Sequence, residues 1–194
     1  MTFIFATHNQ HKLKEVQSLL PEKINVLSLD DIQFNQEIEE TEPTIEGNAL
    51  IKAKAVSLTS GYPCFSDDSG LLVEALNREP GVHSARYAGP QKNDEDNIQK
   101  LLTNLKDTTN RIAYFKTVMA LVFNEKTYLF EGIVNGSITE KKRGSNGFGY
   151  DPVFLPDGFN QTFAEMDAAT KNTISHRGIA LKKLINFLTT SNYL

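Results

Sequence analysis

The sequence has no tryptophan and a single cysteine among its 194 residues. Cys64 cannot form an intrachain disulfide, so nothing indicates an oxidising compartment, and we expect a cytoplasmic protein. Residues 1–9 lack the basic and apolar regions of a secretory signal, and no apolar run elsewhere is long enough to span a bilayer. We therefore expect neither secretion nor membrane insertion.

The charge balance also excludes a class of partner. Lysine and arginine number 20 against 24 acidic residues, which gives a formal net charge of −4. Such a chain offers no general electrostatic attraction to nucleic acid, so we expect no nucleic-acid partner. The length, with no repeat or shift in composition, favours a single domain over residues 1–194 with a sizeable core.

The hydrophobic pattern alternates between strand and helix periods. Apolar runs at 3–6 and 24–29 predict strands, and helical spacing follows at 13–20 and from Thr44 to a stop at Gly61. Residues 111–123 and 127–137 predict a long hairpin, and Ser175 is placed to cap the last helix. These features predict an α/β fold with a mixed sheet flanked by helices.

A polar loop follows the first predicted strand. Its backbone N–H groups and Lys12 are suited to hold phosphate oxygens at a helix start. A second interpretation makes Asn9 a helix cap and leaves Lys12 in solvent. The loop consists of Thr7, His8, Asn9, Gln10, His11 and Lys12, and it lacks the glycine spacing of a P-loop.

Adjacent carboxylates lie between two short apolar runs, in Asp67-Asp68-Ser69-Gly70. Mg²⁺ prefers one or two carboxylates together with substrate phosphates and water, and one aspartate could also accept a proton from the attacking water. The alternative is an ordinary turn at the end of a strand. The Glu39-Glu40 pair reads as a solvated loop unless the aspartate needs a further metal partner.

A glycine-rich segment, residues 144–151, resembles the parts of a nucleobase pocket. Glycines allow close backbone approach, Phe148 or Tyr150 can stack on a base, and Asp151 can accept hydrogen bonds from ring N–H groups. Later in the chain, His176 and Arg177 could donate to base carbonyls. The alternative is that both are surface residues of a helix start, where a cation is poorly placed.

Taken in order, these segments resemble one family over essentially the whole chain. The matching residues are Thr7-x-Asn9-x-x-Lys12, Glu39-Glu40, Glu46-x-Asn48-Ala49-x-x-Lys52-Ala53, Ser66-Asp67-Asp68-Ser69-Gly70, Pro80-Gly81-x-x-Ser84-Ala85-Arg86-Tyr87, Gly147-Phe148-Gly149-Tyr150-Asp151-Pro152 and Ser175-His176-Arg177. The chain is similar to the inosine/xanthosine triphosphate pyrophosphatases, which hydrolyse non-standard purine nucleoside triphosphates.

The resemblance implies Mg²⁺-dependent cleavage of ITP, dITP or XTP between the α and β phosphates, giving the monophosphate and pyrophosphate. It also implies a homodimer with an elongated mixed α/β fold and a nucleotide cleft between two lobes. By position, Asp68 matches the general base and a metal ligand, and Asp67 is its close support. Glu39 or Glu40 matches the further metal-binding acid.

The same resemblance assigns the substrate contacts. Thr7 to Lys12 match the triphosphate loop, with Lys52 and Ser69 nearby. The base and sugar pocket is matched by Phe148, Gly149, Tyr150, Asp151, Lys171, His176 and Arg177. We expect base choice to rest on the 6-keto group, because the 6-amino group of adenine would leave donors of the pocket unpaired.

Two other functions stay open from the sequence. A Maf-like pyrophosphatase would share the metal chemistry but prefer modified pyrimidine or methylated guanine nucleotides. A nucleotide-binding sensor without turnover would bind tightly and release no pyrophosphate. The Phe148-Gly149-Tyr150-Asp151 segment argues against the first, and the retained Asp67, Asp68 and Lys12 argue against the second.

Overall fold

The structure is a computed structural model that describes residues 1–191 and 193. The chain divides into two compact units. Unit 1 comprises Met1–Asp68, Thr117–Gly132 and Arg177–Leu194, and unit 2 comprises Ser69–Lys116 and Ile133–His176. The single domain expected from the sequence stays a prediction.

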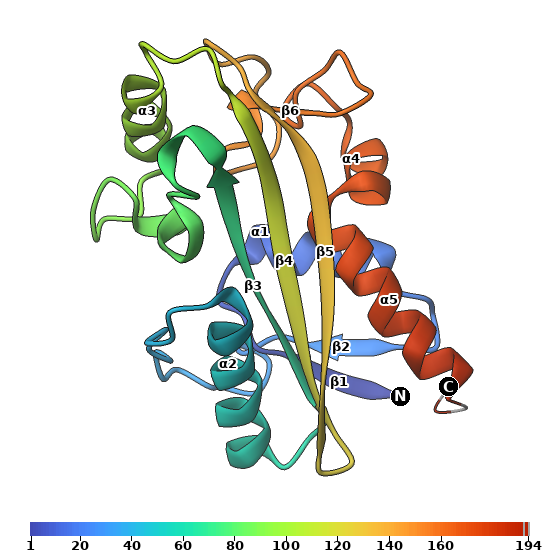
Figure 1. Ribbon diagram of the computed structural model, residues 1–194. Helices are drawn as coiled ribbons and strands as arrows, with labels where there is room; N and C mark the ends of the chain where they lie inside the picture. Colours follow the sequence, from blue (N-terminus) through green and yellow to red (C-terminus); the bar gives the residue numbers. More distant parts are fainter. Residues whose placement is uncertain (192, 194) are drawn as a thin grey trace. The chain divides into compact units, whose positions relative to one another are not determined.

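The described residues form a mixed sheet and five α-helices (Figure 1). Within this part of the chain the sheet has six strands, in the order β2-β1-β3-β4-β5-β6. β1 pairs in parallel with β2 and β3, and β5 pairs antiparallel with β6, so the predicted mixed α/β sheet is confirmed. The strands are β1 Thr2–Phe5, β2 Asn25–Leu27, β3 Cys64–Val73, β4 Ile112–Phe123, β5 Lys126–Ile138 and β6 Phe154–Pro156. The helices are α1 Gln10–Leu19, α2 Ile45–Ser60, α3 Asp94–Asn104, α4 Ala168–Ile174 and α5 His176–Thr190.

Strand β1 supplies the core of unit 1 on both of its faces. Successive side chains of a strand point to opposite faces. Phe3 and Phe5 accordingly pack with apolar residues of α1 and α5, whereas Ile4 packs with Val56 of α2. Both faces of β1 are therefore covered, and the polar residues that follow it begin at the edge of a rigid core.

Unit 2 is built around the end of β3 and a group of aromatic rings. Leu71 and Val73 of β3 are fully buried and share a cluster with apolar residues of α3. The rings of Phe115, Phe154 and Phe163 contact one another in the same cluster, at centroid distances from 4.6 to 6.1 Å. This core supports the glycine-rich segment described below.

The predicted hairpin is confirmed, with a tighter turn than expected. β4 ends at Phe123 and β5 begins at Lys126, so Asn124 and Glu125 alone form the loop. Both have positive φ angles, 49° and 60°. Two central residues with positive φ make the type I′ turn that fits the twist of a two-residue hairpin.

The ordinary turn that the sequence leaves open as an alternative at Asp67-Asp68-Ser69-Gly70 is not formed. β3 continues without a break through all four residues. Polar residues are poor strand formers on their own, but tertiary partners override this preference. Here the side chain of Ser66 donates to the carbonyl of Ala49, and Asp67 and Asp68 meet cations from other elements.

Helix α2 begins as the sequence predicts. Thr44 caps its start by accepting from Gly47 N at 3.1 Å, and Gly61 ends it in the left-handed conformation with φ 71°.

Across residues 1–191 and 193, no helix combines the length and apolarity that crossing a membrane requires.

Candidate functional site

The loop after β1 is organised by Asn9. Its side-chain oxygen accepts from His11 N at 2.9 Å and Lys12 N at 3.2 Å, so Asn9 caps α1. Thr7 in turn accepts from Asn9 N at 3.2 Å. Two of the backbone donors that the sequence assigns to phosphate are thus taken by the cap. His8, Gln10 and His11 are exposed.

A chain of ion pairs links α1, β3 and α5 within unit 1. Lys12 Nζ lies 3.0 Å from Asp67 Oδ1, and Arg177 Nε donates to Asp67 Oδ2 at 3.0 Å. A second nitrogen of Arg177 pairs with Glu15. Lys12 is therefore not a solvated side chain. Arg177, which the sequence assigns to the base pocket, is anchored by its guanidinium inside unit 1.

Asp67 is held as an anion by these cations. Burial alone would raise its pKa, but the attraction of Lys12 and Arg177 outweighs burial and holds the pKa below its usual range. For Lys12 the balance is opposite, because burial lowers its pKa by more than Asp67 restores. Asp67 thus serves to hold two cations in place.

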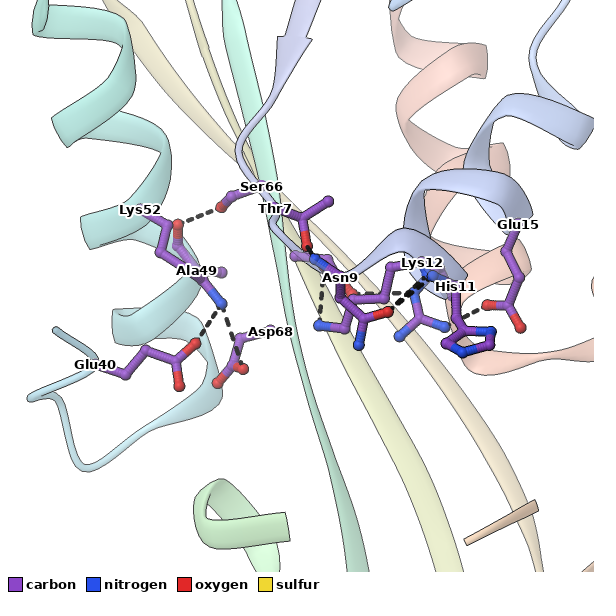
Figure 2. A network of polar contacts seen from close by, with 12 residues as sticks. Thr7, Asn9, His11, Lys12, Glu15, Glu40, Ala49, Lys52, Ser66 and Asp68 are labelled. Atoms are coloured by element: carbon purple, nitrogen blue, oxygen red, sulfur yellow. Dashed lines mark hydrogen bonds and ion pairs between the residues drawn. The ribbon is translucent and has the colours of Figure 1, made fainter. Parts of the chain in front are cut away.

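Lys52 of α2 joins the second aspartate to the acidic segment (Figure 2). Its ammonium lies 2.6 Å from Glu40 Oε1 and 3.6 Å from Asp68 Oδ1. Burial opposes the charge of Lys52, but Asp68 and Glu40 outweigh it and raise its pKa. Glu40 is half-buried beside Asp68, whereas Glu39 is exposed. Of the two candidate glutamates, the structure thus brings Glu40 to Asp68.

Asp68 differs from its neighbour in hydrogen bonding. Its Oδ2 atom is buried and has no hydrogen-bond partner among the described residues. Burial raises the pKa of Asp68, and Lys52 only partly opposes this effect. A buried carboxylate oxygen without a partner is costly, so its presence marks an atom reserved for a ligand, a water or a proton.

These ion pairs join three cations and four carboxylates, the two aspartates included, and the group is here called the charged cluster. Their net charge of −1 does not by itself attract a polyphosphate. Within the described part of the chain, no three His, Cys, Asp or Glu side chains converge on one metal position. The members are Lys12, Lys52, Arg177, Glu15, Glu40, Asp67 and Asp68.

In unit 2, the predicted base residues form a braced loop, here called the base loop, residues 144–151. Asp151 Oδ2 accepts from Phe148 N at 3.0 Å and pairs with Lys171 Nζ at 2.6 Å. Lys171 also lies 5.1 Å from the centre of the Phe148 ring. Gly147 has φ 77°, and a Cβ there would lie 2.0 Å from Asp151 Oδ2. Only glycine fits this close approach.

Phe148 is the aromatic candidate whose ring is half-exposed. Tyr150 lies in the core of unit 2, where its hydroxyl donates to the Ser84 carbonyl at 2.9 Å. Burial raises the pKa of this hydroxyl above its ordinary value. His176 is also buried, with its ring stacked on Phe115 at 4.5 Å. Phe148 is thus better placed than Tyr150 to stack on a base.

Ser69, the remaining predicted contact, is half-buried on β3 in unit 2. Two further residues enter these groups without a sequence signal. Glu15 pairs with Arg177 across 162 residues, and Asp94 Oδ2 accepts from Gly149 N across 55 residues. Neither lies in a motif, and only the folded chain brings them to their partners.

The fold and these two groups of residues define a class of protein: a mixed α/β protein whose central strand β3 carries buried carboxylates that pair with lysines of the helices α1 and α2. A family model described as the Ham1 family matches residues 3–187. The chain belongs to the Ham1 family.

Individual relatives agree with this membership over nearly the full length. The chain is 54% identical over 191 residues to a dITP/XTP pyrophosphatase of Flavobacterium johnsoniae, covering 98% of this chain and 100% of the relative. It is 50% identical to a dITP/XTP pyrophosphatase of Porphyromonas gingivalis, covering 95% and 96%. The solved structure of the Staphylococcus aureus Ham1 protein is similar with a TM-score of 0.90 and 39% identity, covering 98% of this chain and 100% of that chain.

Proposed function

We propose that the protein hydrolyses the non-standard purine triphosphates ITP, dITP and XTP to the nucleoside monophosphate and pyrophosphate. This reaction would remove them from the nucleotide pool before they enter DNA or RNA. The observation that carries the proposal is the buried Asp68 oxygen without a hydrogen-bond partner, beside Lys52. The names of relatives at about half identity support the choice of substrate.

Asp68 and Glu40 fit a magnesium ion. Both offer hard oxygen ligands, and Mg²⁺ takes one or two carboxylates and completes its shell with phosphate oxygens and water. The net charge of −1 on the charged cluster supports the need for a divalent cation before a polyphosphate can bind. When bound, Mg²⁺ would neutralise phosphate charge and stabilise the charge of the transition state.

The chain's own residues supply the rest of the reaction. Asp68 accepts a proton from water, whose oxygen forms a bond to phosphorus while the bond that joins the α and β phosphates breaks. Lys12 and Lys52 offer positive charge to the departing pyrophosphate. Asp67 pairs with Lys12 and so keeps it in position.

Residues of unit 2 select the base of the substrate. The half-exposed ring of Phe148 is suited to stack on a purine. Donors aimed at a 6-keto oxygen would be left unpaired by the 6-amino group of adenine, which costs binding free energy. Hypoxanthine and xanthine share the keto group, so this recognition accepts both.

We extend the proposal to a cytoplasmic homodimer, on the basis of the family resemblance and the single cysteine. Light scattering coupled to size exclusion measures the mass of the particle directly. A mass twice that of the chain supports the dimer, and the mass of one chain contradicts it.

Pyrophosphate release from ITP, XTP, GTP and ATP tests the function. Each nucleotide is supplied in parallel with Mg²⁺ and with a chelator. We expect release from ITP and XTP that depends on Mg²⁺, and much slower release from ATP. Equal rates for ATP and ITP would contradict the base discrimination. No release from any purine would favour a Maf-like activity on modified pyrimidines or, if ITP still binds tightly, a sensor.

A further inference from the structure

Most hydrogen bonds described for the base loop join it to residues 164–166 or lie within the loop itself. Ser145 N and Asn146 N donate to the Ala164 carbonyl, and the Asn146 side chain donates to the Met166 carbonyl at 3.1 Å. Asp151 accepts from Phe148 N, as described above. These bonds fix the two ends of the loop.

The peptide between Phe148 and Gly149 has a different support. Gly149 N donates to Asp94 Oδ2 at 2.6 Å, and Asp94 is the first residue of α3. The neighbouring Glu95 pairs with Lys142, just before the loop. The first turn of α3 thus contacts the base loop at Gly149 and the residue segment just before the loop at Lys142.

Gly149 has room beside its Cα for a side chain. Its φ is 59°, and a Cβ built there would meet no atom within 4 Å. The half-exposed Phe148 ring precedes it. A hydrogen bond to a charged acceptor is stronger than one between neutral groups. The bond from Gly149 to Asp94 therefore sets the orientation of the peptide that carries the stacking ring.

We propose that Asp94 is a positioning residue that determines base specificity by holding the Phe148-Gly149 peptide in its binding conformation. The inference rests on the proposed function, since it assigns a new residue to the recognition of the purine. Asp94 acts through the loop and takes no part in the chemistry on phosphorus. Loss of the Asp94 carboxylate therefore weakens purine binding and discrimination between purines, and leaves the rate of the chemical step unchanged.

The test compares three variants for pyrophosphate release from ITP and GTP. Asp94→Ala removes the acceptor, and Asp94→Asn keeps a neutral oxygen in the same place. Asp96→Ala is the matched control, because it removes a negative charge from the same exposed helix turn, where the carboxylate accepts from Gln91 and not from a residue of the base loop among the described contacts. Thermal unfolding of each variant checks whether the fold is retained.

We expect Asp94→Ala to raise the KM for ITP by about tenfold, with little change in kcat, since one hydrogen bond to a charged group is lost. The preference for ITP over GTP should fall with it. Asp94→Asn should restore most of both values, and Asp96→Ala should match the wild type.

Three results would overturn the inference. The first is an unchanged KM and base preference in Asp94→Ala. The second is an equal effect in Asp96→Ala, which would assign the effect to helix charge. The third is a fall in kcat alone. Failure of the proposed function is distinct, because the wild-type protein itself would then release no pyrophosphate from ITP.

Discussion

Arg177 at the start of α5 donates from Nε to Asp67 Oδ2 of β3 at 3.0 Å, across 110 residues of sequence. The other oxygen of Asp67 pairs with Lys12. One fully buried carboxylate therefore holds two cations from two helices. This arrangement separates the roles of the adjacent aspartates: Asp67 is saturated with partners, and Asp68 keeps an oxygen available.

Replacement of Asp67 by asparagine should destabilise the protein by about 3 kcal/mol, because the buried Lys12 and Arg177 both lose their ion pair with Asp67 and Arg177 keeps only that with Glu15. Asp68→Asn is the matched comparison, since it removes a carboxylate whose ionisation burial already disfavours. Urea denaturation followed by circular dichroism measures both. Equal stability of the two variants would contradict the division of roles.

Asp67 should also make the stability of the protein decrease at acid pH. Its pKa is lower in the folded protein than the ordinary value of about 4, so the unfolded chain binds the proton first as pH falls. The contribution of Asp67 is therefore present above about pH 4 and is lost as pH falls towards its folded pKa. Denaturation curves between pH 7 and pH 3 measure this loss. In Asp67→Asn the stability should fall less steeply over the same range, and an identical slope would refute the assignment.

The loss of Asp68 should reduce turnover far more than it reduces stability. Asp68→Asn removes the proton acceptor and one expected magnesium ligand, and we expect pyrophosphate release from ITP to fall by at least about 100-fold. The thermal unfolding curve should stay cooperative. The exposed Asp157 provides a matched control, since Asp157→Asn changes the same group at a position of unit 2 that is not part of the charged cluster. Full activity in a folded Asp68→Asn would exclude Asp68 as the base.

Local patterns identified much of this fold. Thr44 and Gly61 predict both ends of α2, and alternation over β4 and β5 predicts the hairpin, because caps and periodicity depend on neighbours in the chain. The short helix α4 was not predicted. It has seven residues, too few for a helical hydrophobic period to show.

The site was less predictable where it depends on distant partners. Asp67-Asp68 reads as a turn because polar pairs seldom occupy a central strand, and the cations that satisfy the pair lie on α1, α2 and α5. For the same reason the sequence could not choose between Glu39 and Glu40. The choice depends on which of them reaches Lys52, and that is a property of the folded segment.

Cys64 should resist modification in the native protein. It is fully buried at the start of β3, and burial raises the pKa of its thiol to about 12. A reagent that attacks the thiolate, such as a disulfide probe at pH 8, should therefore react only at the rate of unfolding. One thiol per chain should react promptly in urea. Prompt reaction in native buffer would show that this part of β3 opens readily.

Alanine substitutions at Gly147 and Gly149 of the base loop distinguish the effect of a steric clash from that of backbone strain. Both have positive φ, which an alanine adopts at a cost of about 1 kcal/mol or more. At Gly147 the added Cβ would also lie 2.0 Å from Asp151 Oδ2, whereas at Gly149 it would meet nothing within 4 Å. Gly147→Ala must therefore displace Asp151, which holds Phe148 and Lys171.

We expect Gly147→Ala to raise the KM for ITP well above that of Gly149→Ala and to lower the thermal stability further. Steady-state kinetics and thermal unfolding of the two variants supply both measurements. Because the two substitutions share the backbone cost, their difference reports the Asp151 contact. If Gly149→Ala were the more damaging of the two, the open space beside Gly149, rather than the brace at Asp151, would be the feature on which purine binding depends.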